Sequence, residues 1–241
     1  MRAYWQDSRA PRYSLLLALP LLVVYQVLAV FEPPGPQGGV RNGADVILQG
    51  LFSRLAGAHG PLIFLVCLVG AGVWLALRDL SANRRDLRAS VLGMMLVESA
   101  LLAVAFGTVV SALTSQLVRP TALLAPAQVE GLGLGTRLML SLGAGLYEEL
   151  LFRVLLVGTL AWAGRRVLGW RPLVAGTAAV LIGALVFSGF HYIGPYGDPL
   201  QLYSFVFRTI AGLVFSALFV LRGFGITAWT HALYDAFLLL R

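Results

Sequence analysis

The stretch YEELLFR, residues 147–153, places three charged side chains in the middle of an otherwise apolar segment: Glu148, Glu149 and Arg153. A charged residue at the centre of a membrane helix costs about 2.5–3.5 kcal/mol on insertion scales. Such residues therefore face the protein interior or a water-filled cavity, and they mark a functional site by default. Later apolar segments add three more ionisable side chains, namely His191, His231 and Asp235.

The composition of the whole chain predicts an all-α, polytopic transmembrane helical bundle. The 241 residues are 59% hydrophobic and 12% charged, and the mean hydropathy is +0.83. Soluble domains are about 25% charged. Long continuous apolar runs such as 62–77 are typical of helices and unlike the short alternating segments of a membrane β-barrel.

We expect seven to eight spans in a single membrane-embedded domain, residues 1–241. Residues 1–137 are predicted to be scaffold and residues 138–241 a catalytic core, because the later spans carry nearly all the unusual polar residues. The predicted spans are about Tyr13–Val30, Pro61–Leu77, Ala89–Leu113, Leu138–Ala163, Leu173–Phe190, Leu202–Leu221 and Phe224–Leu240.

Residues 44–55 alternate apolar and polar side chains at helical spacing. This segment is predicted to be either an amphipathic helix on the membrane surface or a short helix packed on the bundle. The single cysteine, Cys67, lies in an apolar run and can form no intrachain disulfide.

The net charge of +7 comes from arginine alone, since the chain has no lysine. The arginines are spread over short loops, which argues against nucleic-acid binding. They are more numerous on the side of the N-terminus, which predicts that the N-terminus is cytoplasmic. The composition favours a bacterial cytoplasmic (inner) membrane, and the membrane side to which the site opens is left undecided.

The spacing within the charged motif predicts a division of roles. Glu149 and Arg153 are four residues apart and share a helix face. Arg153 is therefore expected to neutralise and orient Glu149, or the two form an ion pair that only holds helices together. Glu148 lies about 100° further round the helix, so it is expected to face another group.

Two further polar motifs lie on later spans. Phe187 and His191 end one span, and His231 and Asp235 are four residues apart on another. A carboxylate one turn from a histidine can fix its tautomer or stand beside it as a second polar group.

The order Glu-Glu-x-x-x-Arg, Phe-x-x-x-His and His-x-x-x-Asp resembles the CAAX protease and bacteriocin-processing family, whose eukaryotic members are the Ras-converting prenyl-protein endopeptidases. The resemblance covers roughly residues 138–238. It implies a glutamate-type intramembrane endopeptidase that needs neither metal nor cofactor and cleaves lipidated (CAAX-like) or hydrophobic peptides near the membrane surface.

Roles are implied by position in the motifs. Glu148 would be the general base that activates water, with His191 helping to hold that water. His231 and Asp235 would polarise the scissile carbonyl, with Glu149, Arg153 and Phe187 as supporting residues. The Ras-converting members have Asn in place of Asp235. An ionised Asp cannot donate to an oxyanion, so Asp235 is either protonated or orients His231 as a charged donor.

Two other interpretations remain open. The side chains that would activate water could instead bind a catalytic zinc ion, since Glu, His and Asp are all possible ligands. Alternatively, the chain is a non-enzymatic transporter or scaffold, in which Glu98 would extend a polar path toward Glu148 and His231. Serine chemistry at Ser188 is disfavoured because the small residues usual before such a serine are absent.

Overall fold

The computed structural model describes residues 2–32, 40–82, 86–119, 131–194 and 197–239. Within these ranges the chain is helical and has no strand, which confirms the predicted fold class. The helices are α1 (Arg2–Ser8), α2 (Pro11–Phe31), α3 (Gly43–Ala56), η1 (Gly57–His59), α4 (Gly60–Ala82), α5 (Ala89–Leu117), α6 (Leu134–Gly143), η2 (Ala144–Val157), α7 (Gly158–Arg166), α8 (Pro172–Phe190), α9 (Leu202–Arg222) and α10 (Phe224–Leu239).

Each predicted span coincides with a helix or a continuous helical run, but the count of seven to eight is not confirmed. Among the described residues, five helical segments are long and apolar enough to cross a membrane. The run α6–η2–α7 is interrupted by charged side chains, and α10 has 16 residues. The five candidate spans are Pro11–Phe31, Gly43–Ala82, Ala89–Leu117, Pro172–Phe190 and Leu202–Arg222.

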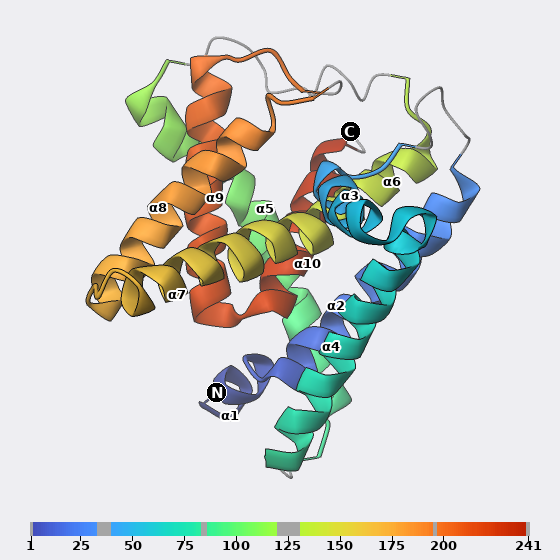
Figure 1. Ribbon diagram of the computed structural model, residues 1–241. Helices are drawn as coiled ribbons and strands as arrows, with labels where there is room; N and C mark the ends of the chain where they lie inside the picture. The colour runs from blue at the N-terminus through green and yellow to red at the C-terminus, as the bar shows by residue number, and fades with distance from the viewer. Residues whose placement is uncertain (1, 33–39, 83–85, 120–130, 195–196, 240–241) are drawn as a thin grey trace.

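Helix α10 is the centre of the bundle. It packs against α2, α5, α6, η2 and α9. The run α6–η2–α7 crosses the middle of the molecule, with α8 and α9 packed at one end and α2 with α4 at the other (Figure 1). The run and α10 therefore present their side chains to each other deep inside the bundle.

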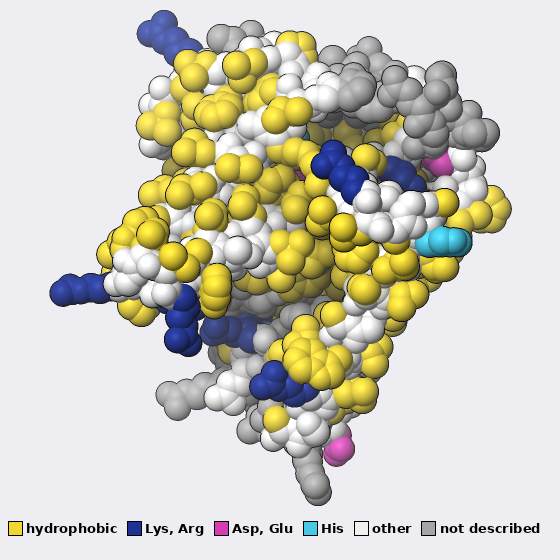
Figure 2. Space-filling model, in the orientation of Figure 1, with side chains coloured by type: hydrophobic (Ala, Val, Ile, Leu, Met, Phe, Trp, Pro, Cys, Tyr) yellow, Lys and Arg dark blue, Asp and Glu magenta, His cyan; other side chains and the backbone are white. Residues whose placement is uncertain are grey.

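The outer surface is largely apolar. Hydrophobic side chains cover most of the face shown in Figure 2. On α5, Val97 and Leu101 are also 61% and 68% exposed. Such a surface is unfavourable in water and suits a lipid environment, where aliphatic side chains can face the acyl chains directly.

Helix α3 packs on the bundle through the side that carries Ala44, Asp45 and Leu48, which are all buried. Asp45 is fully buried, whereas Ile47, Leu51 and Leu55 on the apolar side are exposed. The helix contacts α4 and η2. Helix α3 is packed on the bundle on one side and exposes an apolar face on the other, a combination that both predicted arrangements allow.

A close approach of η2 and α10 sets the geometry of the interior. A Cβ atom at Gly145 would lie 2.2 Å from the Ala228 carbonyl oxygen and 2.6 Å from the Ala232 Cβ. Only glycine permits this contact. It brings the residues one turn further along each helix, Glu149 and His231, into hydrogen-bonding range.

Candidate active site

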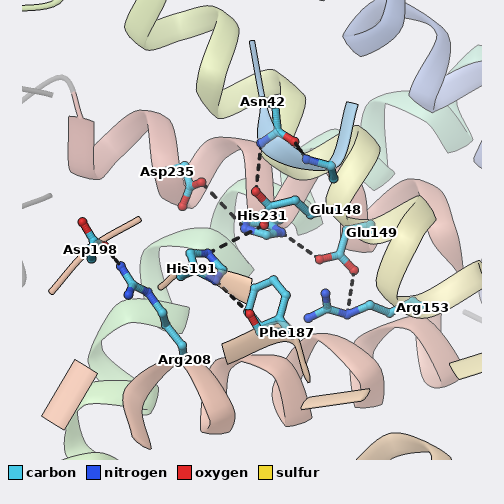
Figure 3. Close-up of polar contacts among 11 residues, drawn as sticks. Asn42, Glu148, Glu149, Arg153, Phe187, His191, Asp198, Arg208, His231 and Asp235 are labelled. Carbon is cyan, nitrogen blue, oxygen red and sulfur yellow. Dashed lines mark hydrogen bonds and ion pairs between the residues drawn. The ribbon is translucent and has the colours of Figure 1, made fainter. Parts of the chain in front are cut away.

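The predicted polar residues lie together in the interior, at the junction of η2, α8 and α10 (Figure 3). Helix η2 contributes the acidic motif and its arginine, the C-terminal end of α8 contributes Phe187 and His191, and α10 contributes His231 and Asp235. The helices come from distant parts of the sequence, so the cluster exists only in the folded chain.

The acidic motif lies on a π-helix. At the end of η2 the Gly158 N–H donates to the carbonyl of Arg153, five residues earlier. π-Helical turns are rare and are often found at functional sites. Glu148, Glu149 and Arg153 are all buried in this wide helix, and the two glutamates face different partners.

Glu149 links Arg153 with His231. Its Oε2 lies 3.2 Å from the Arg153 Nε, and its Oε1 lies 2.7 Å from the His231 Nδ1. The Arg153 guanidinium carbon lies 4.4 Å from the centre of the Phe187 ring. The His231 ring stacks on Phe215 at a centroid distance of 4.2 Å.

Of the two roles expected for Asp235, the structure has the second, because Glu149 fixes the orientation of the His231 ring. The carboxylate of Glu149 accepts a hydrogen bond from Nδ1, so Nε2 points the other way. The nearest Asp235 oxygen lies 3.7 Å from Nε2, beyond normal hydrogen-bonding distance. Asp235 therefore stands beside His231 as a second polar group, while Glu149 fixes the ring.

Glu148 and His191 face each other. The Glu148 Oε2 lies 4.0 Å from the His191 Nε2, and no described residue makes a hydrogen bond to this buried oxygen. The His191 Nδ1 lies 2.8 Å from the Phe187 carbonyl oxygen, which can only accept. Nδ1 therefore carries a proton, and in the neutral ring Nε2 is an acceptor.

Phe187 supports both imidazoles. Its ring centroid lies 4.9 Å from that of His191 and 6.2 Å from that of His231. Its carbonyl group fixes the His191 tautomer, and its ring covers Arg153. One aromatic residue therefore separates the two histidines and shields the buried guanidinium from other partners.

Sequence reasoning missed Asn42, which immediately precedes α3. Its Nδ2 donates to the Glu148 Oε1 over 2.8 Å, and its Oδ1 accepts from the Ala44 N–H over 2.9 Å. An Asn before a helix is a recognisable N-cap signal. That signal predicts the start of α3, but nothing in the local sequence connects residue 42 with residue 148.

A second missed residue lies beside the site. Arg208 of α9 forms an ion pair with Asp198, and its guanidinium carbon lies 5.2 Å from the centre of the Tyr192 ring. Figure 3 shows this pair next to His191. The pair fastens α9 to the segment that follows α8, so it helps to fix the end of α8 that carries the histidine.

Glu98 does not join this cluster. It forms an ion pair with Arg222 at 2.5 Å and accepts a hydrogen bond from Tyr4 at 2.5 Å. These partners belong to the end of α9 and to α1, next to the N-terminus. Glu98 therefore belongs to a separate polar cluster with Arg222 and Tyr4.

A metal site was the other open interpretation. In the described ranges, no three side chains of His, Cys, Asp or Glu gather closely enough to hold a metal ion. Cleavage with and without a zinc chelator distinguishes a zinc site from a metal-independent one.

A helical bundle with a largely apolar surface and a buried cluster of ionisable side chains is typical of a membrane-embedded protein. Residues 131–237 match the model of the family described as type II CAAX prenyl endopeptidase Rce1-like. This match is to the family that the three motifs predicted.

The matched region contains every motif residue from Glu148 to Asp235. The family implies a CAAX protease, which is a peptide hydrolase, and together with the apolar helices it identifies an integral membrane protein. Comparisons with curated proteins and with solved structures give no match.

Proposed function

We propose that the chain is a membrane-embedded endopeptidase in which Glu148 activates water for attack on a peptide bond. The observation that carries this proposal is the pairing of Glu148 Oε2 with His191 Nε2 at 4.0 Å. The other carboxylate oxygen of Glu148 is hydrogen-bonded to Asn42, and the other ring nitrogen of His191 is hydrogen-bonded to the Phe187 carbonyl.

The separation of 4.0 Å suits one water molecule. A water oxygen about 2.8 Å from both atoms would subtend roughly 90° between them, close to the angle between its own two O–H bonds. Both acceptors would then use the two water hydrogens, and the oxygen lone pairs would point away toward a substrate. Glu148 takes one proton as the hydroxide adds to the carbonyl carbon.

His231 is placed to stabilise the oxyanion that forms. Glu149 holds its Nδ1–H, so the charged imidazolium would present Nε2–H on the side of Asp235. A donor aimed at a developing oxyanion is worth about 10²–10³ in kcat. The intermediate then collapses as Glu148 returns its proton to the leaving amine.

The substrate class follows from the family and the lipid-facing surface. A peptide next to a prenyl or other hydrophobic anchor would be held at the membrane while its backbone reaches the site. We propose such lipidated (CAAX-like) or hydrophobic peptides as substrates, and a bacterial cytoplasmic membrane as the location.

The experiment is cleavage of prenylated and unprenylated quenched-fluorescent peptides by detergent-purified protein. Glu148→Gln and His191→Ala should each lower kcat by about 10²–10⁴, the usual contribution of a general base. A strong zinc chelator should leave wild-type cleavage unchanged. Loss of cleavage on chelation with recovery on added zinc would support the zinc interpretation, and full activity of Glu148→Gln would refute the proposed function.

A further inference from the structure

We propose that Asn42 is a positioning residue for Glu148: it holds one carboxylate oxygen so that the other faces His191. This inference rests on the proposed function. The Asn42 Nδ2 donates to Oε1 over 2.8 Å, while Oε2 is buried without a hydrogen bond to any described residue and points at His191. Rotation of the Glu148 carboxylate away from Asn42 would break the one hydrogen bond that the described residues make to it.

The amide of Asn42 is itself fixed in one orientation. Its Oδ1 caps α3 by accepting from the Ala44 N–H, and its own backbone N–H donates to the Tyr25 hydroxyl over 3.3 Å. A flipped amide would direct Oδ1 at the Glu148 carboxylate, where two acceptors would repel each other, and would leave the Ala44 N–H without its cap. The NH₂ group can therefore face only Glu148.

Hydrogen bonds to a buried carboxylate hold the first turn of α3 in place. Asp45 is fully buried and accepts three hydrogen bonds, from the Tyr25 hydroxyl at 2.7 Å, Arg41 Nη1 at 2.9 Å and Gln49 Nε2 at 2.6 Å. Tyr25 belongs to α2, so this network ties α3 to another helix. Asn42 is consequently held in place by the bundle, as a positioning group must be.

Asn42 lies outside the matched region, residues 131–237. The division into a scaffold of residues 1–137 and a catalytic core of residues 138–241 therefore needs revision under this proposal. The N-terminal part would contribute the hydrogen bond that orients the catalytic base, and α3 would be the element that carries it.

Asn42→Asp separates positioning from helix capping. Asn and Asp are nearly equal as N-caps, so a residue that only caps α3 would tolerate the change. The proposal predicts that kcat falls by at least about 10-fold, a part of the 10²–10⁴ that a general base supplies. KM should stay within about twofold. The cap of α3 is kept, but the melting temperature should fall, because the second Asp oxygen would lie beside the buried Glu148 carboxylate.

The matched control is Gln26→Glu. Its amide donates to the Tyr147 hydroxyl over 2.9 Å, so this variant makes the same amide-to-carboxylate change in a neighbouring polar contact. We expect kcat within about twofold of wild type, since a Tyr hydroxyl can turn and donate to the new carboxylate. An equal loss in both variants would show that added charge alone is responsible and would overturn the proposal.

Wild type and Glu148→Gln are assayed beside these variants. If Glu148→Gln cleaves the peptides as fast as wild type does, the proposed function itself fails. If cleavage depends on Glu148 but Asn42→Asp retains wild-type kcat, only the role of Asn42 is refuted. Should Asn42→Asp not fold, Asn42→Ser keeps a capping oxygen without a charge, and the same 10-fold criterion for kcat decides.

Discussion

Arg153, Glu149 and His231 form a buried network, and we expect removal of its different side chains to cost different amounts of stability. Glu149 has two charged or chargeable partners, at 3.2 Å and 2.7 Å. For Arg153, Glu149 supplies the only ion pair found among the described residues, and its nitrogens make no aligned hydrogen bond there. Removing Glu149 therefore isolates a buried guanidinium, whereas removing Arg153 leaves Glu149 bound to His231.

The expected magnitudes follow from this asymmetry. Removing one partner of a buried ion pair costs about 3–5 kcal/mol, whereas a hydrogen bond between membrane helices averages about 0.6 kcal/mol. Arg153 is 1% exposed, so Glu149→Gln should approach the larger figure. Arg153→Met should cost less, because the thioether side chain can fill the apolar space between Phe187 and Phe215.

The double variant Glu149→Gln/Arg153→Met should be more stable than Glu149→Gln alone. It removes the uncompensated charge together with its partner, and replacement of a whole buried pair is often neutral. The measurement is thermal unfolding followed by far-ultraviolet circular dichroism in one detergent. At about 2–4 °C per kcal/mol for a chain of this size, Glu149→Gln should melt about 6–20 °C below wild type.

Two outcomes would refute this reasoning. The first is an Arg153→Met protein that melts below Glu149→Gln, since that would give the arginine stabilising contacts other than the ion pair. The second is a double variant whose loss equals the sum of the two single losses, since independent sites add and members of one network do not.

Three further predictions concern the same framework. Gly145→Ala should destabilise the protein by about 1–3 kcal/mol and impair cleavage, because its Cβ meets the backbone of α10. Gly158→Ala is the control in the same helical run and should not destabilise the protein, since the new Cβ would lie 3.9 Å from the Arg153 carbonyl oxygen. Asp235→Asn should keep at least a tenth of wild-type kcat/KM, because an amide can donate to an oxyanion; loss of all cleavage would show that the carboxylate is required. Glu98→Gln should lower the unfolding free energy by about 1–3 kcal/mol with kcat/KM within about twofold, and a large loss of cleavage would contradict its placement outside the site.

The sequence predicts the helices well because their signal is local. A continuous apolar run specifies a membrane helix wherever it occurs, and each predicted span coincides with helical structure. The number of crossings is less predictable. The helical run that contains Glu148 and Arg153 has charged side chains within its apolar sequence. Its hydropathy is lowered by them, so the helix that carries the candidate site is poorly predicted as a membrane span.

The candidate site shows where local reasoning ends. The spacing of four placed Glu149 and Arg153 on one face, and the structure has them 3.2 Å apart. The same spacing offered Asp235 two roles, to fix the His231 ring or to stand beside it, and Glu149 takes the first of them. The reason is the contact at Gly145, which brings η2 against α10 more closely than side-chain spacing within α10 can reveal.

Asn42, the site residue most distant in sequence, is the hardest to predict from the sequence. Asn42 has an ordinary local role as the cap of α3, and that role explains its identity without any reference to Glu148. Its NH₂ group becomes available to the glutamate only because Oδ1 is already engaged in the cap. A residue whose local function fixes the orientation of its second polar group can thus act on a site 106 positions away in the chain. Substitutions that preserve the cap but change that second group, such as Asn42→Asp, are the ones that can separate the two roles.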